Sequence, residues 1–309
     1  MHIKRPINSI IHNCLWHFHK DRLRIPPQQL KNYKSIFKKT WDTLGCPPNI
    51  FEGEDFNNKI KWLMIFDQQP KIITCSDKLA VREFIAKKIG ESYLTPIYAT
   101  WNNSRDIDFS ILPDQFVIKT NHDSGSVWII HDRNSFDLEK TRIEISKSLN
   151  RKYGINKGEW CYQHIQPQAF AEKLLGDPTS SVDDYKFHCS DGNVIFLQYI
   201  YNRKHRTAYE QIIDPNGCAT KIQLSNHFQP GDRFSKPKHW EEMLYIAKTL
   251  STGFKYVRVD LYSIDNKIKF GELTFYPRNG NYKGEGQATL GRLIPLDRKS
   301  HQETANKIK

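Results

Sequence analysis

Hydrophobic residues recur at helical spacing in three stretches of the chain. The first, residues 7–18, has basic neighbours, and the last covers about 137–150. The middle stretch has an apolar face made of Leu79, Val81, Phe84, Ile85 and Ile89. Gly90 stops that helix, and Ser76 or Asp77 can cap its start. We expect the N-terminal helix to pack on the body of the protein, with contact to a membrane surface as the alternative.

Short apolar runs separated by turns predict β-strands in the middle of the chain. The run FVIK at 116–119 precedes a Gly/Ser-rich loop, NHDSGS, at 121–126, and VWIIH follows at 127–131. Such a loop can hold a phosphate, because small residues let backbone N–H groups come close to it. We expect Val117 and Ile118 to be buried. We expect residues 121–126 to be mobile without a ligand, since few apolar contacts would hold them.

Two hairpins are predicted further along the chain. The first spans 184–201 and turns at Asp191-Gly192, and its alternation places Lys186, His188 and Ser190 on one face. The second spans 255–277. There the apolar residues Val257, Val259 and Leu261 point one way, while Arg258 and Asp260 point the other way.

The second hairpin contains two carboxylates whose relative position depends on the length of its turn. Asp260 and Glu272 are 272 − 260 = 12 residues apart. A three-residue loop at 265–267 sets Asp260 opposite Glu272, whereas a two-residue loop sends them to opposite faces. If they converge, they form a hard-cation site of the kind that Mg²⁺ prefers when it bridges phosphates. The alternative is a surface ladder of ion pairs with Arg258.

Composition and charge limit the class of protein. The chain has 309 residues and is 38% hydrophobic, which is too apolar for disorder, and its longest apolar runs are too short to span a bilayer. No secretory signal is visible, so we expect a cytoplasmic protein. Six scattered cysteines without metal-ligand spacing indicate reduced, mostly buried thiols, and Cys75 has no evident base to make it a nucleophile.

The net charge of +12 is concentrated near the N-terminus. Residues 1–50 contain nine Lys or Arg and two Asp, so 9 − 2 = +7 of the excess lies there. A basic face attracts nucleic acid, anionic lipid or an acidic substrate, although a solvated surface is the simplest interpretation.

In their order along the chain, these pieces resemble the ATP-grasp superfamily, and specifically its TupA-like branch of polysaccharide-associated ligases. The resemblance rests on the ordered set SDKLAVREF, LPDQFVIKTNHDSGS, EWCYQHIQPQAFAEKLLGD, DDYKFHCSDG and YVRVDLY…FGELTF, and it covers most of the chain. It implies an α+β ATP-grasp fold with the nucleotide between two lobes and extra N-terminal helices. The implied divisions are a basic helical extension at 1–60, an N-terminal or linker lobe at 61–115, a small lobe with the phosphate loop and adenine hinge at 116–175, a C-terminal lobe with the metal site at 176–285 and a tail at 286–309.

The resemblance also implies which residues bind ATP. Lys78 and Lys119 would contact the phosphates, and the loop at 121–126 would fold over the β- and γ-phosphates. The main chain of Lys173 and Leu175, in the hinge sequence EKLL, would read the adenine edge. The full implied set is Lys78, Lys119, His122, Gly125, Ser126, Glu172, Lys173, Leu174, Leu175, Asp184 and Lys186.

The implied chemistry is ATP-dependent activation of a carboxylate to an acylphosphate, which an amine opens to form an amide. Mg²⁺ would be held by Asp260 and Glu272, and Thr274 stands where the superfamily often has an asparagine ligand. Arg258, Lys119 and Lys186 would stabilise the transferring phosphoryl group or the oxyanion.

The branch implies a uronic acid of a bacterial surface polysaccharide as the carboxylate and an amino acid or amine as its partner. The basic N-terminus would suit an anionic membrane surface or a lipid-linked glycan, with the protein peripheral at the inner face of the membrane. Two rival functions remain: a glycan kinase or glycosyltransferase, and a nucleic-acid binder. The latter lacks a recognisable recognition motif, so we expect no specific nucleic acid.

Overall fold

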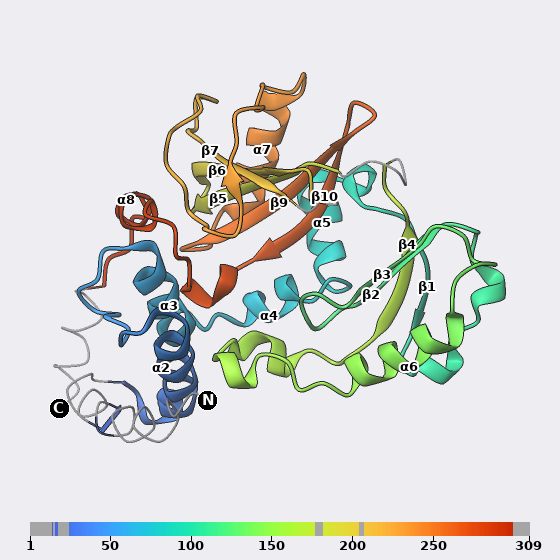
Figure 1. Cartoon of the computed structure of the whole chain (residues 1–309), viewed down its shortest axis with the longest axis horizontal. Helices are drawn as coiled ribbons and strands as arrows, with labels where there is room; N and C mark the ends of the chain where they lie inside the picture. Colours follow the sequence, from blue (N-terminus) through green and yellow to red (C-terminus); the bar gives the residue numbers. More distant parts are fainter. Residues whose placement is uncertain (1–13, 15, 18–24, 177–181, 204–206, 299–309) are drawn as a thin grey trace, which may run out of the picture.

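Two β-sheets, each with its own core, form the body of the protein (Figure 1). The computed structural model describes residues 14, 16–17, 25–176, 182–203 and 207–298. The four-stranded sheet has the order β1-β4-β2-β3, and its strands are β1 (Ile97–Trp101), β2 (Phe116–Thr120), β3 (Val127–Ile130) and β4 (Ala169–Lys173). The six-stranded sheet has the order β10-β9-β5-β6-β7-β8, and its strands are β5 (Asp184–Ser190), β6 (Asn193–Tyr201), β7 (Tyr209–Ile213), β8 (Gln229–Pro230), β9 (Val257–Ile264) and β10 (Lys267–Thr274).

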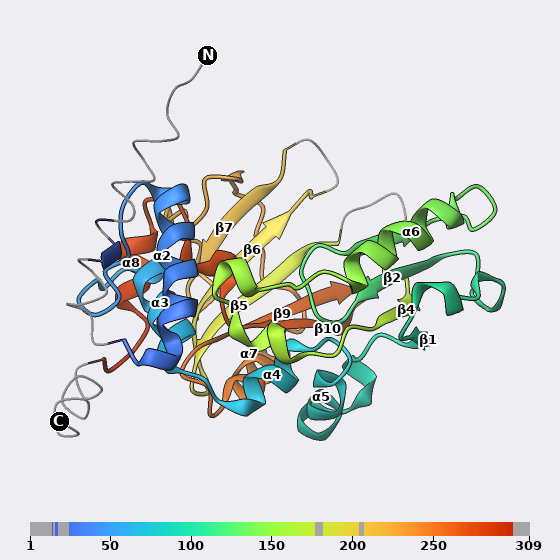
Figure 2. The same ribbon diagram turned by 90° about the horizontal axis from the view of Figure 1, so that it is seen from below.

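Helices cover the sheets and connect them (Figure 2). The α-helices are α2 (Leu30–Leu44), α3 (Phe56–Phe66), α4 (Pro70–Ser76), α5 (Val81–Ile89), α6 (Leu138–Leu149), α7 (Trp240–Ser251) and α8 (Gln287–Arg292). The 3-10 helices are η1 (Pro27–Gln29), η2 (Glu91–Tyr93), η3 (Ser104–Asp106), η4 (Phe109–Ile111), η5 (Ile155–Lys157), η6 (Trp160–His164) and η7 (Pro277–Gly280). No helix among these described residues is long and apolar enough to cross a membrane.

The predicted helices α5 and α6 are confirmed, and side-chain hydrogen bonds lie at or near their starts. Asp77 Oδ1 accepts from the amides of Leu79 and Ala80 at 2.8 and 3.2 Å in the turn just before α5, but the N-cap residue of α5 is Ala80, which makes no side-chain cap hydrogen bond, so neither Ser76 nor Asp77 caps this helix. Asp137 Oδ1 accepts from the Lys140 amide at 2.9 Å at the start of α6. The predicted helix at 7–18 lies almost entirely outside the described residues.

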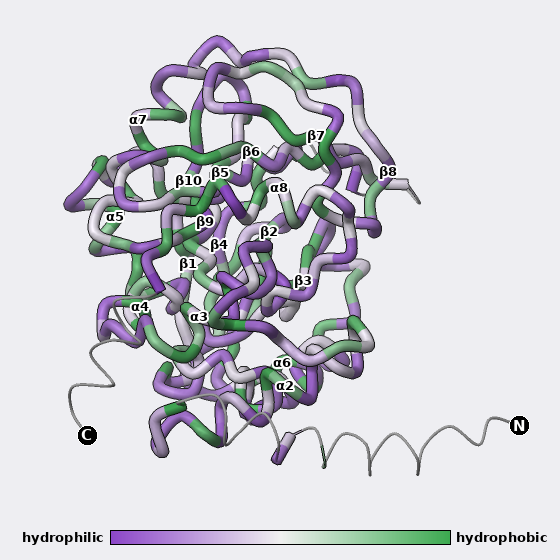
Figure 3. The backbone as a smooth tube through the Cα atoms, turned by 90° about the vertical axis from the view of Figure 1, so that its left-hand side faces the viewer, coloured by the Kyte–Doolittle hydropathy of each residue, from purple (hydrophilic) through white to green (hydrophobic). Residues whose placement is uncertain are grey.

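Each sheet buries one face against a helix. Ile145 of α6 is in the core of the four-stranded sheet together with Phe116 and Ile118. On the six-stranded sheet, Trp240 of α7 packs on Phe187, with ring centroids 5.8 Å apart. Figure 3 shows the hydrophobic segments following the strands of this sheet. The opposite face of the six-stranded sheet is therefore the one that can carry polar chemistry.

The β9–β10 hairpin places Asp260 opposite Glu272, but its turn length and strand register differ from those predicted. The turn has only two residues, Asp265 and Asn266, both with positive φ (49° and 56°), and Ile264 pairs with Lys267. A β-bulge between Phe270 and Glu272 then shifts the register by one residue. The predicted three-residue loop is wrong, yet the two carboxylates face each other.

Gly271 makes this bulge sterically feasible. A Cβ at this position would lie 3.0 Å from the Asp260 carbonyl oxygen and 3.0 Å from the Tyr262 ring. Such contacts are tighter than side chains normally tolerate, so the close approach of the two strands favours glycine here.

Candidate active site

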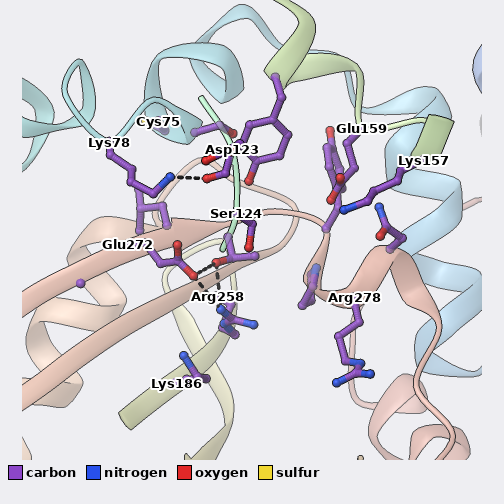
Figure 4. Close-up of a pocket in the computed structure, with 18 of the residues that line it drawn as sticks. Cys75, Lys78, Asp123, Ser124, Lys157, Glu159, Lys186, Arg258, Glu272 and Arg278 are labelled. Carbon is purple, nitrogen blue, oxygen red and sulfur yellow. Dashed lines mark hydrogen bonds and ion pairs between the residues drawn. The ribbon is translucent and has the colours of Figure 1, made fainter. Parts of the chain in front are cut away.

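A cavity of about 390 Å³ lies where the loop of the four-stranded sheet meets the polar face of the six-stranded sheet (Figure 4). Its walls come from the β2–β3 loop, the α4–α5 junction, strands β5, β6, β9 and β10, and the segments around η5 and η7. Of the residues implied by the family resemblance, Lys78, Lys186, Arg258 and Glu272 line it. The structure thus brings together residues up to 194 positions apart (272 − 78 = 194).

Arg258, Asp260 and Lys186 form a buried ionic network on one wall of the cavity. The pairing of β5 with β9 sets Lys186 beside Asp260, and Lys186 Nζ donates to Asp260 Oδ2 at 2.5 Å. Arg258 Nε donates to Asp260 Oδ1 at 2.6 Å and Arg258 Nη2 donates to Asp260 Oδ2 at 2.7 Å. Burial alone would raise the pKa of Asp260, but the two cations outweigh it and hold this pKa below its usual value. Asp260 is therefore ionised at neutral pH.

Glu272 and Thr274 extend this network toward the cavity. Arg258 Nη2 donates to Glu272 Oε1 and to Thr274 Oγ1, both at 3.0 Å, and Thr274 Oγ1 donates to Glu272 Oε1 at 3.0 Å. The Glu272 side chain is 42% exposed, whereas that of Asp260 is 2% exposed. Glu272 is thus the carboxylate that a ligand in the cavity can reach.

These donors fit a magnesium ion only with help from a phosphate. The described residues contain no group of three or more His, Cys, Asp or Glu side chains placed to hold a metal ion. Mg²⁺ commonly takes one or two carboxylates and completes its octahedron with water and substrate phosphates. Asp260 and Glu272 meet that requirement in type and number, although both oxygens of Asp260 already accept from Arg258 or Lys186.

Lys78 lies where the two sheets meet at the cavity. It lies in the turn between α4 and α5, and its Nζ donates to the carbonyl oxygens of Thr120, at 2.9 Å, and of Asp123. Burial lowers the pKa of Lys78, and the nearby carboxylates of Glu272 and Asp123 oppose that effect. The lysine therefore lies between the β2–β3 loop and Glu272 of β10.

Lys119 and the predicted adenine hinge lie outside the lining of this cavity. Lys119 Nζ donates to Glu172 Oε1, which ties the strand lysine directly to the hinge. The Lys173 amide already donates to the Pro96 carbonyl at 3.0 Å, so that N–H group is engaged. Lys173 is exposed, and Leu174 and Leu175 are partly exposed. Their roles in nucleotide binding stay predictions.

The β2–β3 loop has many more contacts than expected. Val117 and Ile118 are buried as predicted, but so are Asn121, His122, Asp123 and Ser126 in the loop. Asp123 accepts from Thr120 Oγ1 at 2.6 Å, from Ser148 Oγ at 2.9 Å and from Ser126 Oγ. Hydrogen bonds thus hold this loop, and its expected mobility without a ligand stays a prediction.

Only the tip of that loop is exposed, and it reaches the cavity through a residue that was not predicted. Ser124 lines the cavity, whereas His122, Gly125 and Ser126 do not. Gly125 has φ 93°, and a Cβ there would meet open space. Asp184 also lies away from the lining, where it accepts from Arg203 at 2.9 Å and lies 3.1 Å from Lys186 Nζ.

No residue at the far end of the cavity was among the predicted site residues. Tyr153, Lys157, Glu159, Arg278 and Asn279 line it. They lie in short 3-10 segments and connecting loops, which have no periodic pattern to reveal them. Burial raises the pKa of Glu159 to about 7, with Lys157 opposing the effect. Glu159 stood out in the sequence only as the first residue of the stretch EWCYQHIQPQAFAEKLLGD.

Cys75 lines the cavity but has no nucleophilic character. Burial raises the pKa of its thiol to about 12, so it is protonated at neutral pH. The cysteines at 14, 46, 75, 161, 189 and 218 are all free, and half of them (75, 161 and 189) are buried. The prediction of mostly buried thiols is therefore only half right.

Comparison with known proteins gives one family match. The model of the TupA-like ATP-grasp family matches residues 58–294. No curated protein matches the chain.

Solved structures that match this chain include three ligases, all distant in sequence. The D-alanine–D-alanine ligase of Bacillus anthracis, complexed with ATP, is 16% identical, with 76% of this chain and 69% of that chain covered and a TM-score of 0.42. The ATP-grasp ligase PsnB, complexed with a minimal precursor, is 16% identical, with 74% and 61% covered and a TM-score of 0.39. This chain thus spans less than two thirds of PsnB. The D-alanine–D-alanine ligase of Helicobacter pylori is 16% identical, with 83% and 69% covered and a TM-score of 0.38.

Proposed function

The chain belongs to the TupA-like ATP-grasp family, and from this premise we propose that it is an ATP-dependent ligase that joins a carboxylate to an amine through an acylphosphate. The predicted family and the predicted α+β fold are thereby confirmed. The observation that carries the proposal is the charge of the cavity. Its lining has six cations, Lys78, Lys157, Lys186, Arg203, Arg258 and Arg278, and three acids, Asp123, Glu159 and Glu272.

This excess of positive charge suits a reaction between anions. Phosphoryl transfer from ATP to a carboxylate brings several negative charges together, and catalysis then consists mostly of positioning and charge neutralisation. Lys78 and Lys186 would neutralise phosphate oxygens, and Arg258 would stabilise the transferring group or the tetrahedral oxyanion that follows. Lys119 would contribute from the four-stranded sheet on nucleotide binding.

Glu272 and Asp260 would hold the Mg²⁺ that accompanies the nucleotide. When bound, the ion would supply charge neutralisation between the carboxylates and the phosphates. Because Arg258 contacts both carboxylates, it would fix their orientation whether or not the ion is present.

The substrates that we propose are a uronic acid of a bacterial surface polysaccharide and an amino acid or related amine. The resemblance to polysaccharide-associated ligases supports this class. Lys157 and Arg278 also support it, since both are cations that line the far end of the cavity. Either would suit the carboxylate of an incoming amino acid. The basic N-terminal fifty residues would favour an anionic, lipid-linked form of the glycan at the inner face of the membrane.

Two measurements test the proposal. With purified protein, ATP and Mg²⁺, ADP release should require both a uronic acid and an amine. In the producing cell, loss of the protein should remove an amide-linked substituent from the surface glycan, as seen by mass spectrometry. ADP release that needs a saccharide but no amine would instead indicate a glycan kinase.

A further inference from the structure

Two buried polar side chains at the far end of the cavity lack normal partners. Glu159 is 6% exposed and Asn279 is 9% exposed, and both line the cavity. The two side chains adjoin each other, yet Glu159 Oε2 and Asn279 Nδ2 make no hydrogen bond of normal geometry to a described residue. Buried polar atoms are rarely left in this state, because each one loses its hydration without compensation. An acceptor and a donor are thus available together for a ligand.

The fold fixes this pair of residues from both sides. Glu159 follows Gly158, whose φ is 73°, and a Cβ there would lie 2.5 Å from Ile36 of α2, so the missing side chain lets α2 pack closely against the segment. Asn279 has φ 55° within η7, a conformation that is costly for a residue with a side chain. Lys61 of α3 donates to the next carbonyl, that of Gly280, and holds η7 in place.

The position of Glu159 relative to the ionic network suggests its role. Figure 4 shows Lys78 and Glu272 on one side of the cavity and Glu159 and Lys157 on the other, with Ser124 and Arg258 between them. If the phosphates occupy the Lys78 side, a nucleophile that attacks the activated carboxyl must approach from the Glu159 side.

We propose that Glu159 binds the incoming amine and acts as its general base, an inference that rests on the proposed ligase function. An ammonium group donates one proton to the Glu159 carboxylate and becomes a neutral amine. The nitrogen lone pair then attacks the acyl carbon of the acylphosphate, forming the C–N bond and an oxyanion. Collapse of this species breaks the C–O bond to phosphate, and phosphate leaves with the second proton from nitrogen. Glu159 returns its proton to solvent.

The surroundings of Glu159 match this task. Its titratable neighbours are Lys157 on its own segment and the neutral side chains Tyr153, Cys161, Tyr162 and Tyr276. Burial raises the pKa of Glu159 to about 7. A carboxyl group with such a pKa accepts a proton from an ammonium group far more readily than an ordinary glutamate does.

The test compares the reaction of two nucleophiles in three proteins: wild type, Glu159→Gln and the control Glu285→Gln. Glu285 is a matched control because it is an exposed glutamate outside the cavity. Each protein receives ATP, Mg²⁺ and D-glucuronate or D-galacturonate, free or as the nucleotide sugar. The nucleophile is either an amino acid, which is an ammonium ion at pH 7, or hydroxylamine, which is neutral and needs no base. We expect Glu159→Gln to lose about 100-fold or more in amide formation and to retain hydroxamate formation. Glu285→Gln should match wild type with both nucleophiles, and ATP affinity should be unchanged in both variants.

The outcomes separate this inference from the proposed function. Equal loss of both products in folded Glu159→Gln, or no loss of the amide, overturns the role of Glu159 while the ligase function stands. Absence of hydroxamate from wild-type protein with every uronic acid overturns the proposed function, and the inference falls with it. If Glu159→Gln does not fold, Glu159→Asp replaces it, and the same selective loss with amino acids is expected.

Discussion

The two ends of the cavity differ in how far their polar groups are already satisfied. At one end, Asp260 accepts hydrogen bonds from two cations, and Arg258 bridges it to Glu272. At the other end, Glu159 and Asn279 present atoms without normal partners. Charged groups that are paired and immobile need little reorganisation when charge develops on a phosphate. Unpaired groups instead destabilise the free protein, and a substrate that forms hydrogen bonds with them gains binding free energy.

The end of the cavity that contains Asp260, Arg258 and Glu272 is called the paired end below. The largest effect should come from the substitution Asp260→Asn at this end. This variant should lose Mg²⁺-dependent turnover and about 3–5 kcal/mol of unfolding free energy, because Arg258 and Lys186 are buried and would both lose the charge of the carboxylate that they share. Urea denaturation and ADP release measure the two effects. Asp265→Asn, an exposed change in the turn of the same hairpin, should alter neither. An unchanged stability of Asp260→Asn would mean that the network is solvated.

Glu272→Gln should separate activity from stability at the same end. Turnover should fall by about 100-fold or more, since the carboxylate that reaches the cavity loses its charge. Stability should change by less than about 1 kcal/mol, because the side chain is 42% exposed and its pairing is screened by solvent. Titration of ADP release with Mg²⁺ is the measurement. Wild-type rates at limiting Mg²⁺ would remove Glu272 from the metal site.

Lys119→Ala tests whether this lysine of the four-stranded sheet binds ATP together with the residues of the paired end. A lost charge-assisted contact of roughly 1.5–3 kcal/mol should weaken ATP binding about 10- to 100-fold. Calorimetric titration with ATP measures this, and Lys147→Ala on the exposed side of α6 is the control. Unchanged affinity would leave Lys119 as a structural partner of Glu172 only.

The smallest effect should be a gain of stability from substituting Glu159, at the unpaired end of the cavity, which contains Glu159 and Asn279. Because the pKa of Glu159 is raised from 4.5 to about 7, the folded protein binds more protons than the unfolded chain between these values. Stability from this group therefore falls as pH rises from about 4.5 to 7 and is absent above that range. Glu159→Gln should be more stable than wild type by about 2 kcal/mol at pH 8, with the difference shrinking toward pH 5. A pH-independent difference would show that Glu159 has an ordinary pKa.

Much of the fold followed from periodic patterns. The alternation in 184–201 set Lys186 and His188 on one face, and the alternation in 255–264 set Arg258 and Asp260 on one face. The pairing of β5 with β9 then joins these two faces. The amphipathic pattern of 79–89 likewise predicted α5 and its end at Gly90.

The rest depended on contacts that no local pattern encodes. The hydrogen bonds of the β2–β3 loop involve Ser148 of α6, a residue 22 to 27 positions away along the chain (148 − 126 and 148 − 121). The far end of the cavity needs α2 and α3 to hold the segments of Glu159 and Asn279. Such residues become visible only when packing brings distant 3-10 segments together.

The bulge at Gly271 bears on how this site should be sought in other sequences. With a two-residue turn and regular pairing, Asp260 would face position 271, and the bulge moves position 272 into that place. The separation of the two acidic residues is therefore the sum of a turn length and a bulge, and either can change if the other compensates. A search that fixes the interval at twelve would miss relatives with a three-residue turn and bulge, where the interval is thirteen, or with a two-residue turn and no bulge, where it is eleven. A search should therefore allow an interval of eleven to thirteen residues. It should require a glycine before the second acidic residue only where the turn is too short to give that interval without a bulge.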